Sequence, residues 1–81
     1  MKPLVTLYTR AGCCLCDQAK RVLADARRRA DFEYEELDID RDPELLCLYN
    51  DEVPVIAINR AKAFKYRIEM NEFLKRLAAR S

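Results

Sequence analysis

The chain contains no histidine and no tryptophan, and its only glycine is Gly12. Without histidine it cannot by itself build a Ser-His or Cys-His nucleophile, a mixed Cys/His zinc finger or a histidine general base. Any thiol that reacts in this chain must therefore be activated by backbone dipoles, by nearby cations or by a carboxylate.

A strong charge of one sign is also lacking, because 15 Lys and Arg residues stand against 14 Asp and Glu residues and the net charge is +1. This balance gives no field that favours nucleic acid or a membrane surface, so we expect neither as a partner. The apolar stretch near the start is too short for a signal peptide, and no run is long enough to cross a membrane. We expect one domain over residues 1–81, monomeric and cytoplasmic.

The cysteines are unevenly placed, with Cys13, Cys14 and Cys16 crowded into four positions and Cys47 far away. Cysteines this close in sequence cannot join distant segments. They fit a redox or metal site in a reducing compartment better than structural disulfides. Cys13 and Cys16 form a C-x-x-C pair.

Apolar periodicity and turn residues predict alternating strands and helices. Strands are expected at residues 4–8, 32–39, 55–58 and 63–66, and helices at 14–30, 43–49 and 69–79. The second strand changes parity between Tyr34 and Leu37, which indicates a bulge or a slip. The order β-α-β-α-β-β-α predicts an α/β fold with a four-stranded mixed sheet flanked by helices. Its first two strands are parallel, and its last two form a hairpin with a turn at 59–62.

The C-x-x-C pair directly follows a strand and precedes a helix, which is typical of a thiol–disulfide active site. Residues three apart on a helix lie about 5–6 Å apart at Cβ, so a disulfide can join Cys13 and Cys16, whereas Cys14 projects to another side. We expect the amide groups that open the helix to lower the pKa of Cys13. Cys13 then attacks and Cys16 resolves the mixed disulfide, and Arg10 is a candidate for cationic support and substrate contact.

Two other interpretations of the cysteines stay open at this point. Cys14 and Cys16 could join Cys13 and Cys47 as thiolate ligands of a metal or an iron–sulfur cluster, although no second close cysteine pair supports this and we assign no metal ligand. The chain could also be a protein-binding module with an inert dithiol. Cys47 itself is expected to pack in the core.

Pro54 opens the third strand, where a missing N–H group is tolerated. X-Pro bonds are trans by default and cis in only about 5–6% of cases. A cis bond here would turn the backbone of Val53 toward the dithiol, where its N–H and C=O groups could pair with an extended substrate. The residues alone leave both isomers open, and they make Val53 and Pro54 candidate substrate-binding residues.

Three segments together resemble the small glutaredoxin-like proteins of the thioredoxin-fold superfamily. They are residues 7–19 around the dithiol, residues 36–45 and residues 51–55. The resemblance extends over nearly the whole chain. It implies a thioredoxin fold, disulfide reduction with Cys13 as nucleophile and Cys16 as resolving thiol, and a cis bond before Pro54.

The chain departs from most glutaredoxins at two places that bear on glutathione. Glu52 stands where they have threonine, and Tyr66 and Arg67 stand where they have a Gly-Gly pair. Side chains there occupy the space that glycine leaves for close backbone approach. Glutathione as reductant is therefore allowed by the resemblance but disfavoured by these residues, and the electron donor is left unidentified. We expect no bound cofactor, and a disulfide-containing protein or a small thiol compound as substrate.

Basic residues gather at two places in the sequence. A run from Arg27 to Arg29, with Lys20 and Arg21, lies on the polar side of the first predicted helix and is interpreted as a solvated face. A second group surrounds the hairpin and is expected to guide an acidic protein partner to the dithiol: Arg60, Lys62, Lys65 and Arg67.

Overall fold

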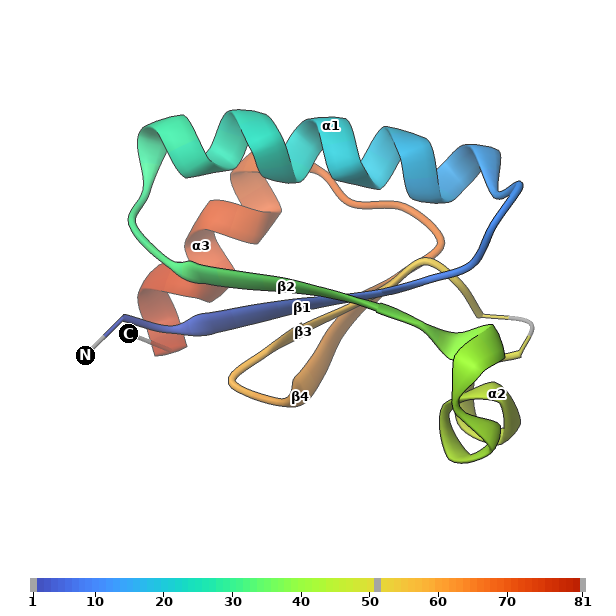
Figure 1. Cartoon of the computed structure of the whole chain (residues 1–81). Coiled ribbons are helices and arrows are strands. Elements are labelled where there is room, and N and C mark those ends of the chain that lie inside the picture. The colour runs from blue at the N-terminus through green and yellow to red at the C-terminus, as the bar shows by residue number, and fades with distance from the viewer. Residues whose placement is uncertain (1, 51, 81) are drawn as a thin grey trace.

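The computed structural model describes residues 2–50 and 52–80. Its elements follow the predicted order, with one short 3₁₀ helix, η1, that the sequence did not predict (Figure 1). In chain order they are β1 (Leu4–Thr9), α1 (Cys14–Arg29), β2 (Glu33–Asp38), η1 (Ile39–Arg41), α2 (Pro43–Tyr49), β3 (Val55–Ile58), β4 (Ala61–Lys65) and α3 (Met70–Arg80). Among the described residues, no helix combines the length and the apolar character that crossing a membrane requires.

The strands form one mixed sheet in the order β2-β1-β3-β4. β1 and β2 are parallel and are joined by α1, whereas β3 is antiparallel to both β1 and β4. This arrangement confirms the predicted four-stranded mixed sheet. It brings the end of β1, the start of α1 and the segment before β3 to one end of the molecule (Figure 1).

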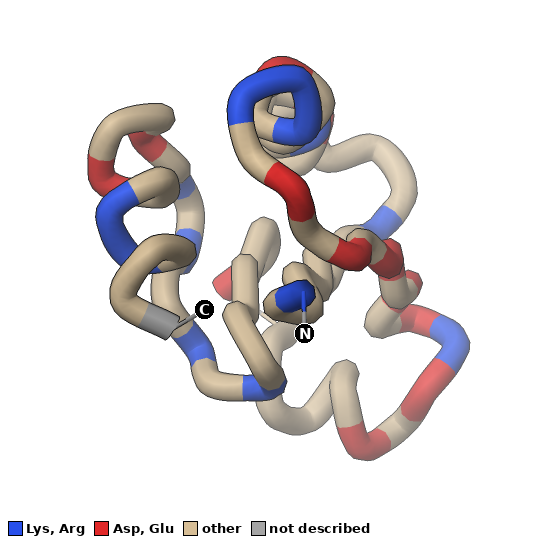
Figure 2. The backbone as a smooth tube through the Cα atoms, turned by 90° about the vertical axis from the view of Figure 1, so that its left-hand side faces the viewer, with Lys and Arg blue, Asp and Glu red and all other residues tan. Residues whose placement is uncertain are grey.

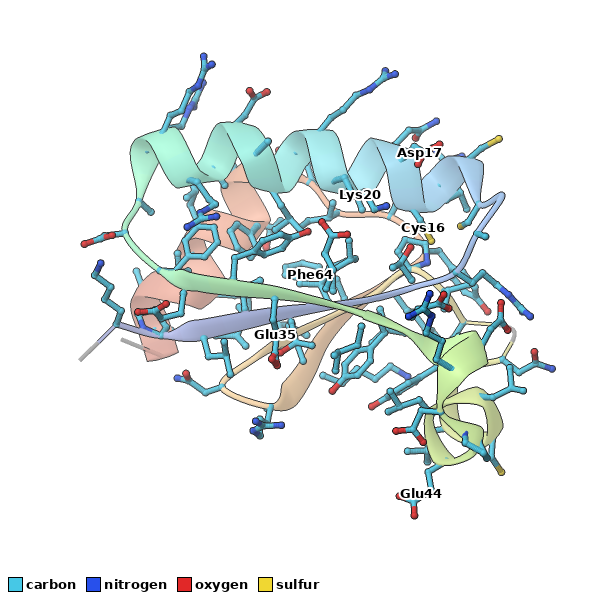
Figure 3. The ribbon with its side chains drawn as sticks, in the orientation of Figure 1. Cys16, Asp17, Lys20, Glu35, Glu44 and Phe64 are labelled. Carbon is cyan, nitrogen blue, oxygen red and sulfur yellow. The ribbon has the colours of Figure 1, made fainter. Side chains whose placement is uncertain are left out.

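The two faces of the sheet are covered by different helices. α1 and α3 pack on one face, where alternate strand residues such as Leu7 and Ile56 form the larger core cluster with Phe73 of α3. α2 covers the opposite face at one end, over Tyr8 and Val55. Figure 3 shows Phe64 and Glu35 on opposite sides of the sheet, as the strand alternation requires. Figure 2 shows acidic and basic residues interspersed along the described backbone.

The bulge predicted in the second strand is wrong. β2 pairs with β1 in an unbroken register from Leu4↔Glu33 to Thr9↔Asp38. Its apolar parity changes because both faces of the strand are covered at different points: Tyr34 packs on the α1/α3 side and Leu37 on the α2 side. The register shift lies instead between β3 and β4, at Ile56 and Ala57.

The hairpin turn is tighter than predicted. β4 begins at Ala61, and the turn is made by Asn59 and Arg60, both with positive φ, at 52° and 68°. Two positive φ values match the right-handed twist of the strands that the turn joins. Asn59 also accepts a hydrogen bond from the N–H group of Leu4 at 2.9 Å, so the turn is tied to the start of β1.

Cys47 lies on the exposed side of α2, so the prediction that it packs in the core is wrong. The helix begins as predicted, with Asp42 accepting a hydrogen bond from the N–H group of Glu44 at 3.0 Å. Its inward positions are filled by Leu45, Leu46 and Tyr49. Cys47 faces away from that stripe because of the helical repeat.

Candidate dithiol active site

Cys13 is the residue that caps the N-terminus of α1. Its backbone is extended, and its Sγ atom accepts a hydrogen bond from the N–H group of Cys16 at 3.1 Å. The carbonyl of Cys13 accepts the N–H group of Asp17 at 3.2 Å, which starts the helix. Gly12, just before, has a φ of +73°, which glycine adopts without steric cost. The turn thus points one sulfur at an amide group that has no partner within the helix.

The two sulfurs differ in exposure, as the sequence predicted. Cys13 is half-buried, and Cys16 is only 1% exposed, on the side of α1 that faces the sheet (Figure 3). Cys14 is exposed, and all these thiols are free. An accessible sulfur therefore lies one helical turn from a shielded one, which is the order of access that attack and resolution need.

The expected lowering of the pKa of Cys13 is not found. Partial burial of the thiol and its hydrogen bond with the Cys16 side chain raise this pKa, whereas the N–H groups of Cys16 and Leu15 lower it. The raising effects prevail, so the pKa of Cys13 lies above that of a free cysteine. The helix N-terminus contributes in the predicted direction, but the second thiol beside it opposes the same charge.

Arg10 contacts other groups than the thiols. Its guanidinium donates to Asp40 Oδ1 at 2.7 Å and to the carbonyl and side-chain oxygens of Asn50, both at 3.1 Å. These bonds join the segment before Cys13 to η1 and to the end of α2. No sequence pattern indicates these two partners, because they lie 30 and 40 residues away along the chain.

Val53 and Pro54 lie at the start of β3, and the bond between them is cis, as the resemblance implied. Pro54 is fully buried, and its carbonyl accepts the N–H group of Tyr66 at 2.8 Å. Val53 is partly buried, and no backbone hydrogen bond joins it to the rest of the described chain.

Glu52, which replaces the threonine of most glutaredoxins, is paired with two cations of the hairpin. It contacts Lys62 through a short hydrogen bond and Lys65 at 3.7 Å. The hydrogen bond from Lys62 and the charges of both lysines hold the pKa of Glu52 below its usual value. The predicted basic group at the hairpin is thus partly neutralised. Pairing across β3 and β4 brings these residues together, which sequence separation had hidden.

Two depressions border the dithiol region. The larger, of about 630 Å³, is lined by Arg10, Lys20 and Arg41 together with Glu36, Asp38 and Asp42, and by Thr9, whose buried hydroxyl has no partner among the described residues. The smaller, of about 120 Å³, lies between α1 and the segment after β4. Within residues 2–50 and 52–80, no group of Cys, Asp and Glu side chains is arranged to hold a metal ion, and Cys47 does not join Cys13 and Cys16.

Comparison with known proteins places these features in a family. The profile of the family described as "Glutaredoxin-like domain (DUF836)" matches residues 4–78. A protein of Dictyostelium discoideum named as glutaredoxin-like is 32% identical in an alignment of 71 residues that covers 80% of this chain and 66% of that protein. The chain therefore spans 66% of the length of that curated relative.

Solved structures agree with this assignment. The crystal structure of a structural genomics target protein from X. campestris is 32% identical, with a TM-score of 0.78 that covers 93% of this chain and 96% of the other. A mutant thioredoxin from Halobacterium salinarum shares the fold with a TM-score of 0.75 at 12% identity, over 98% of this chain and 74% of the thioredoxin. The chain therefore has the thioredoxin fold and belongs to the glutaredoxin-like domain family.

Proposed function

We propose that this protein is a dithiol oxidoreductase that reduces disulfide bonds with Cys13 and Cys16. One observation carries the proposal: the half-buried sulfur of Cys13 accepts the amide N–H group of Cys16, whose own thiol lies buried one turn further along α1. An accessible nucleophile, an amide donor that stabilises its anion and a shielded second thiol are thereby collected at one helix N-terminus.

The reaction consists of two thiol–disulfide exchanges. The Cys13 thiolate attacks one sulfur of a substrate disulfide, forms a mixed disulfide and releases the other substrate sulfur as a thiolate, which takes up a proton. The Cys16 thiolate then attacks Cys13 Sγ and releases the second substrate thiol. The protein is left with a Cys13–Cys16 disulfide, having given two electrons to the substrate. An external thiol or dithiol donor must return these electrons.

The raised pKa of Cys13 sets the conditions for attack. A free cysteine is only about a few per cent ionised at neutral pH, and the raised pKa makes the ionised fraction of Cys13 smaller still. The intrinsic nucleophilicity of a thiolate rises with its pKa, with a Brønsted coefficient of about 0.4–0.5, which offsets part of that loss. The proposed enzyme is therefore slow at neutral pH and becomes faster as the solution becomes more alkaline.

The other candidate residues take roles that fit their contacts. The backbone groups of Val53, beside Pro54, have no backbone partner in the described part of the chain, which suits an extended peptide substrate added as a strand. Arg10, engaged with Asp40 and Asn50, acts as a positioning residue for the segment before Cys13. We place the reaction in the cytoplasm, because the crowded thiols suit a reducing compartment. We propose that the protein acts as a monomer.

Single cysteine variants, each reduced beforehand, test this proposal in a single-turnover reduction of 2-hydroxyethyl disulfide, in which the protein itself supplies the two electrons. Cys13→Ser should abolish turnover, because the attacking sulfur is lost. Cys14→Ser and Cys47→Ser, which alter exposed thiols, serve as matched controls and should retain it. Full activity of Cys13→Ser would exclude the mechanism. Recycling of the oxidised protein by glutathione, or by a flavin-dependent dithiol reductase, identifies the class of electron donor.

A further inference from the structure

We infer that the small pocket between α1 and the segment after β4 selects the substrate. On the basis of the proposed disulfide reduction, the preferred substrate is a protein segment that carries an apolar side chain and an acidic residue within two positions of its reactive cysteine. The apolar side chain enters the pocket, and the acidic residue pairs with Arg67 at the rim.

The pocket begins at Leu15, the residue between Cys14 and Cys16 in the first turn of α1. On one side it is lined by Leu15 and Gln18, in the first turns of the helix that Cys13 caps, and on the other by Tyr66 and Arg67. Ala19, Val22 and Ile68 complete its lining. The backbone of Tyr66 is held next to the start of β3 by the hydrogen bond from its N–H group to the carbonyl of Pro54, at 2.8 Å. Its volume of about 120 Å³ admits one aliphatic side chain and excludes a larger ligand.

Tyr66 occupies a conformation that its side chain disfavours. Its φ is +67°, a region that glycine adopts freely and that is sterically unfavourable for a bulky residue. The side chain of Tyr66 contributes little to packing in the core, because it is 43% exposed. Among the described residues it is one of two large apolar side chains that are exposed. A backbone outlier with an exposed aromatic side chain at the edge of an active site indicates a use outside the fold.

The charges around the pocket define the second feature of the substrate. Lys62 and Lys65 are already paired with Glu52, and the Lys65 ammonium lies 5.5 Å from the centre of the Tyr66 ring. Arg67 is exposed, lines the pocket and forms no ion pair with the described part of the chain. Arg67 is therefore the cation left at the rim for an acidic group, and a basic residue at that place is repelled by Arg67.

The test compares four peptide disulfides that carry either leucine or serine, and either glutamate or lysine, beside the cysteine, with 2-hydroxyethyl disulfide as a substrate without side chains. For the unchanged protein we expect kcat/KM to be about tenfold higher with leucine than with serine, the usual size of discrimination by a small apolar pocket. Glutamate should be preferred to lysine by about threefold, as expected for an exposed pair.

Two variants and two matched controls locate these preferences. Tyr66→Gly should remove the preference for leucine, and its backbone suits a positive φ, so the fold is kept. Arg67→Glu should reverse the preference between glutamate and lysine. Leu48→Ala changes the other exposed large apolar residue, on the opposite face of the sheet, and Arg28→Glu makes the same charge change at the far end of α1. Neither control should alter the preferences.

The pocket and the chemistry fail in distinguishable ways. Equal kcat/KM values for all four peptides overturn the inference, and so does an equal effect of Leu48→Ala and Tyr66→Gly. If 2-hydroxyethyl disulfide is not reduced at all, the proposed reaction is wrong. The pocket is then tested separately, by measuring how tightly peptides bind to it. Peptides with serine in place of cysteine should still bind the unchanged protein more tightly with leucine than without it, and Tyr66→Gly should abolish this difference.

Discussion

The rate at which Cys13 is alkylated should rise with pH through the whole neutral range. Burial and the hydrogen bond with the Cys16 side chain raise the pKa of Cys13 above that of a free cysteine. Below its pKa, the thiolate fraction increases about tenfold for each pH unit, so the rate should increase about 100-fold between pH 6 and pH 8 without reaching a plateau. A thiol with a strongly lowered pKa would reach its limiting rate within that range.

Removal of the second thiol tests the physical cause of the shift. Cys16→Ala takes away the hydrogen bond and the negative charge that oppose ionisation of Cys13, but it keeps the backbone N–H groups of Cys16 and Leu15 that favour ionisation. The pKa of Cys13 should therefore fall in this variant. At pH 7 its alkylation should be faster than in the reduced unchanged protein.

The assay is alkylation by iodoacetamide, followed by mass spectrometry of the peptide that contains Cys13. Cys14 and Cys47 are replaced by serine in both proteins so that only the dithiol reacts, and the same chain in denaturant supplies the pH profile of an unperturbed cysteine. The profile of the folded protein should lie at higher pH than this reference. A plateau below pH 7, or a shift of Cys16→Ala to higher pH, would refute the reasoning.

Three further predictions concern the scaffold. Arg10→Ala should lower the free energy of unfolding by about 1 kcal/mol, or about 4–8 °C in Tm, because it breaks the contacts to Asp40 and Asn50; calorimetry should show a smaller effect for Lys2→Ala, which breaks only the more exposed pair with Asp31. Phe73→Ala should cost about 3–5 kcal/mol in urea denaturation, because Phe73 is fully buried and its ring centre lies 5.6 Å from that of Phe32. The exposed control Leu48→Ala should change the free energy of unfolding by no more than about 0.5 kcal/mol. An equally small loss for Phe73→Ala would contradict this packing. The reduced protein should lose stability as pH rises above about 8.5. Folding raises the pKa of Cys13, which stabilises the folded state below the unfolded pKa, and this stabilisation is lost as pH rises through the folded pKa. The control Cys13→Ser should lose less stability over the same pH interval.

The features that depend on neighbouring residues were accessible from the sequence. The start of α1 at Cys14, the depth of Cys16 relative to Cys13 and the cap at Asp42 follow from spacing within a few positions. Helix periodicity also placed Phe73 and Leu77 in the core. These predictions succeeded because the physics of capping and helix faces is local.

The features that failed depend on contacts between distant parts of the chain. The alternation of apolar residues in β2 led to the wrong prediction of a bulge. α2 covers one face of the sheet at one end and α1 covers the other face, so Leu37 and Tyr34 are both partly buried, on opposite sides of the strand. The pairing of Glu52 with Lys62 arises only when β3 and β4 form their hairpin. Cys47 was misplaced because cysteine is usually buried, and this general tendency outweighed the helical stripe of α2.

The electrostatics of the dithiol show a different limit. The sequence predicted the direction in which the helix amides act on Cys13, and the structure contains those hydrogen bonds. It did not predict the balance, because burial of the sulfur and the Cys16 side chain act in the opposite direction. A pKa is a sum of opposing effects of similar size, so one correct contribution does not give its sign.

Mapping the sulfur bonds that form during turnover tests the central claim most directly. After reaction of the reduced protein with a substrate disulfide, digestion and mass spectrometry should find a disulfide between Cys13 and Cys16. In the Cys16→Ala variant, the same digestion should find a mixed disulfide between the substrate and Cys13. Substrate bound to Cys14 instead, or a protein that releases product without forming the Cys13–Cys16 bond, would contradict the account.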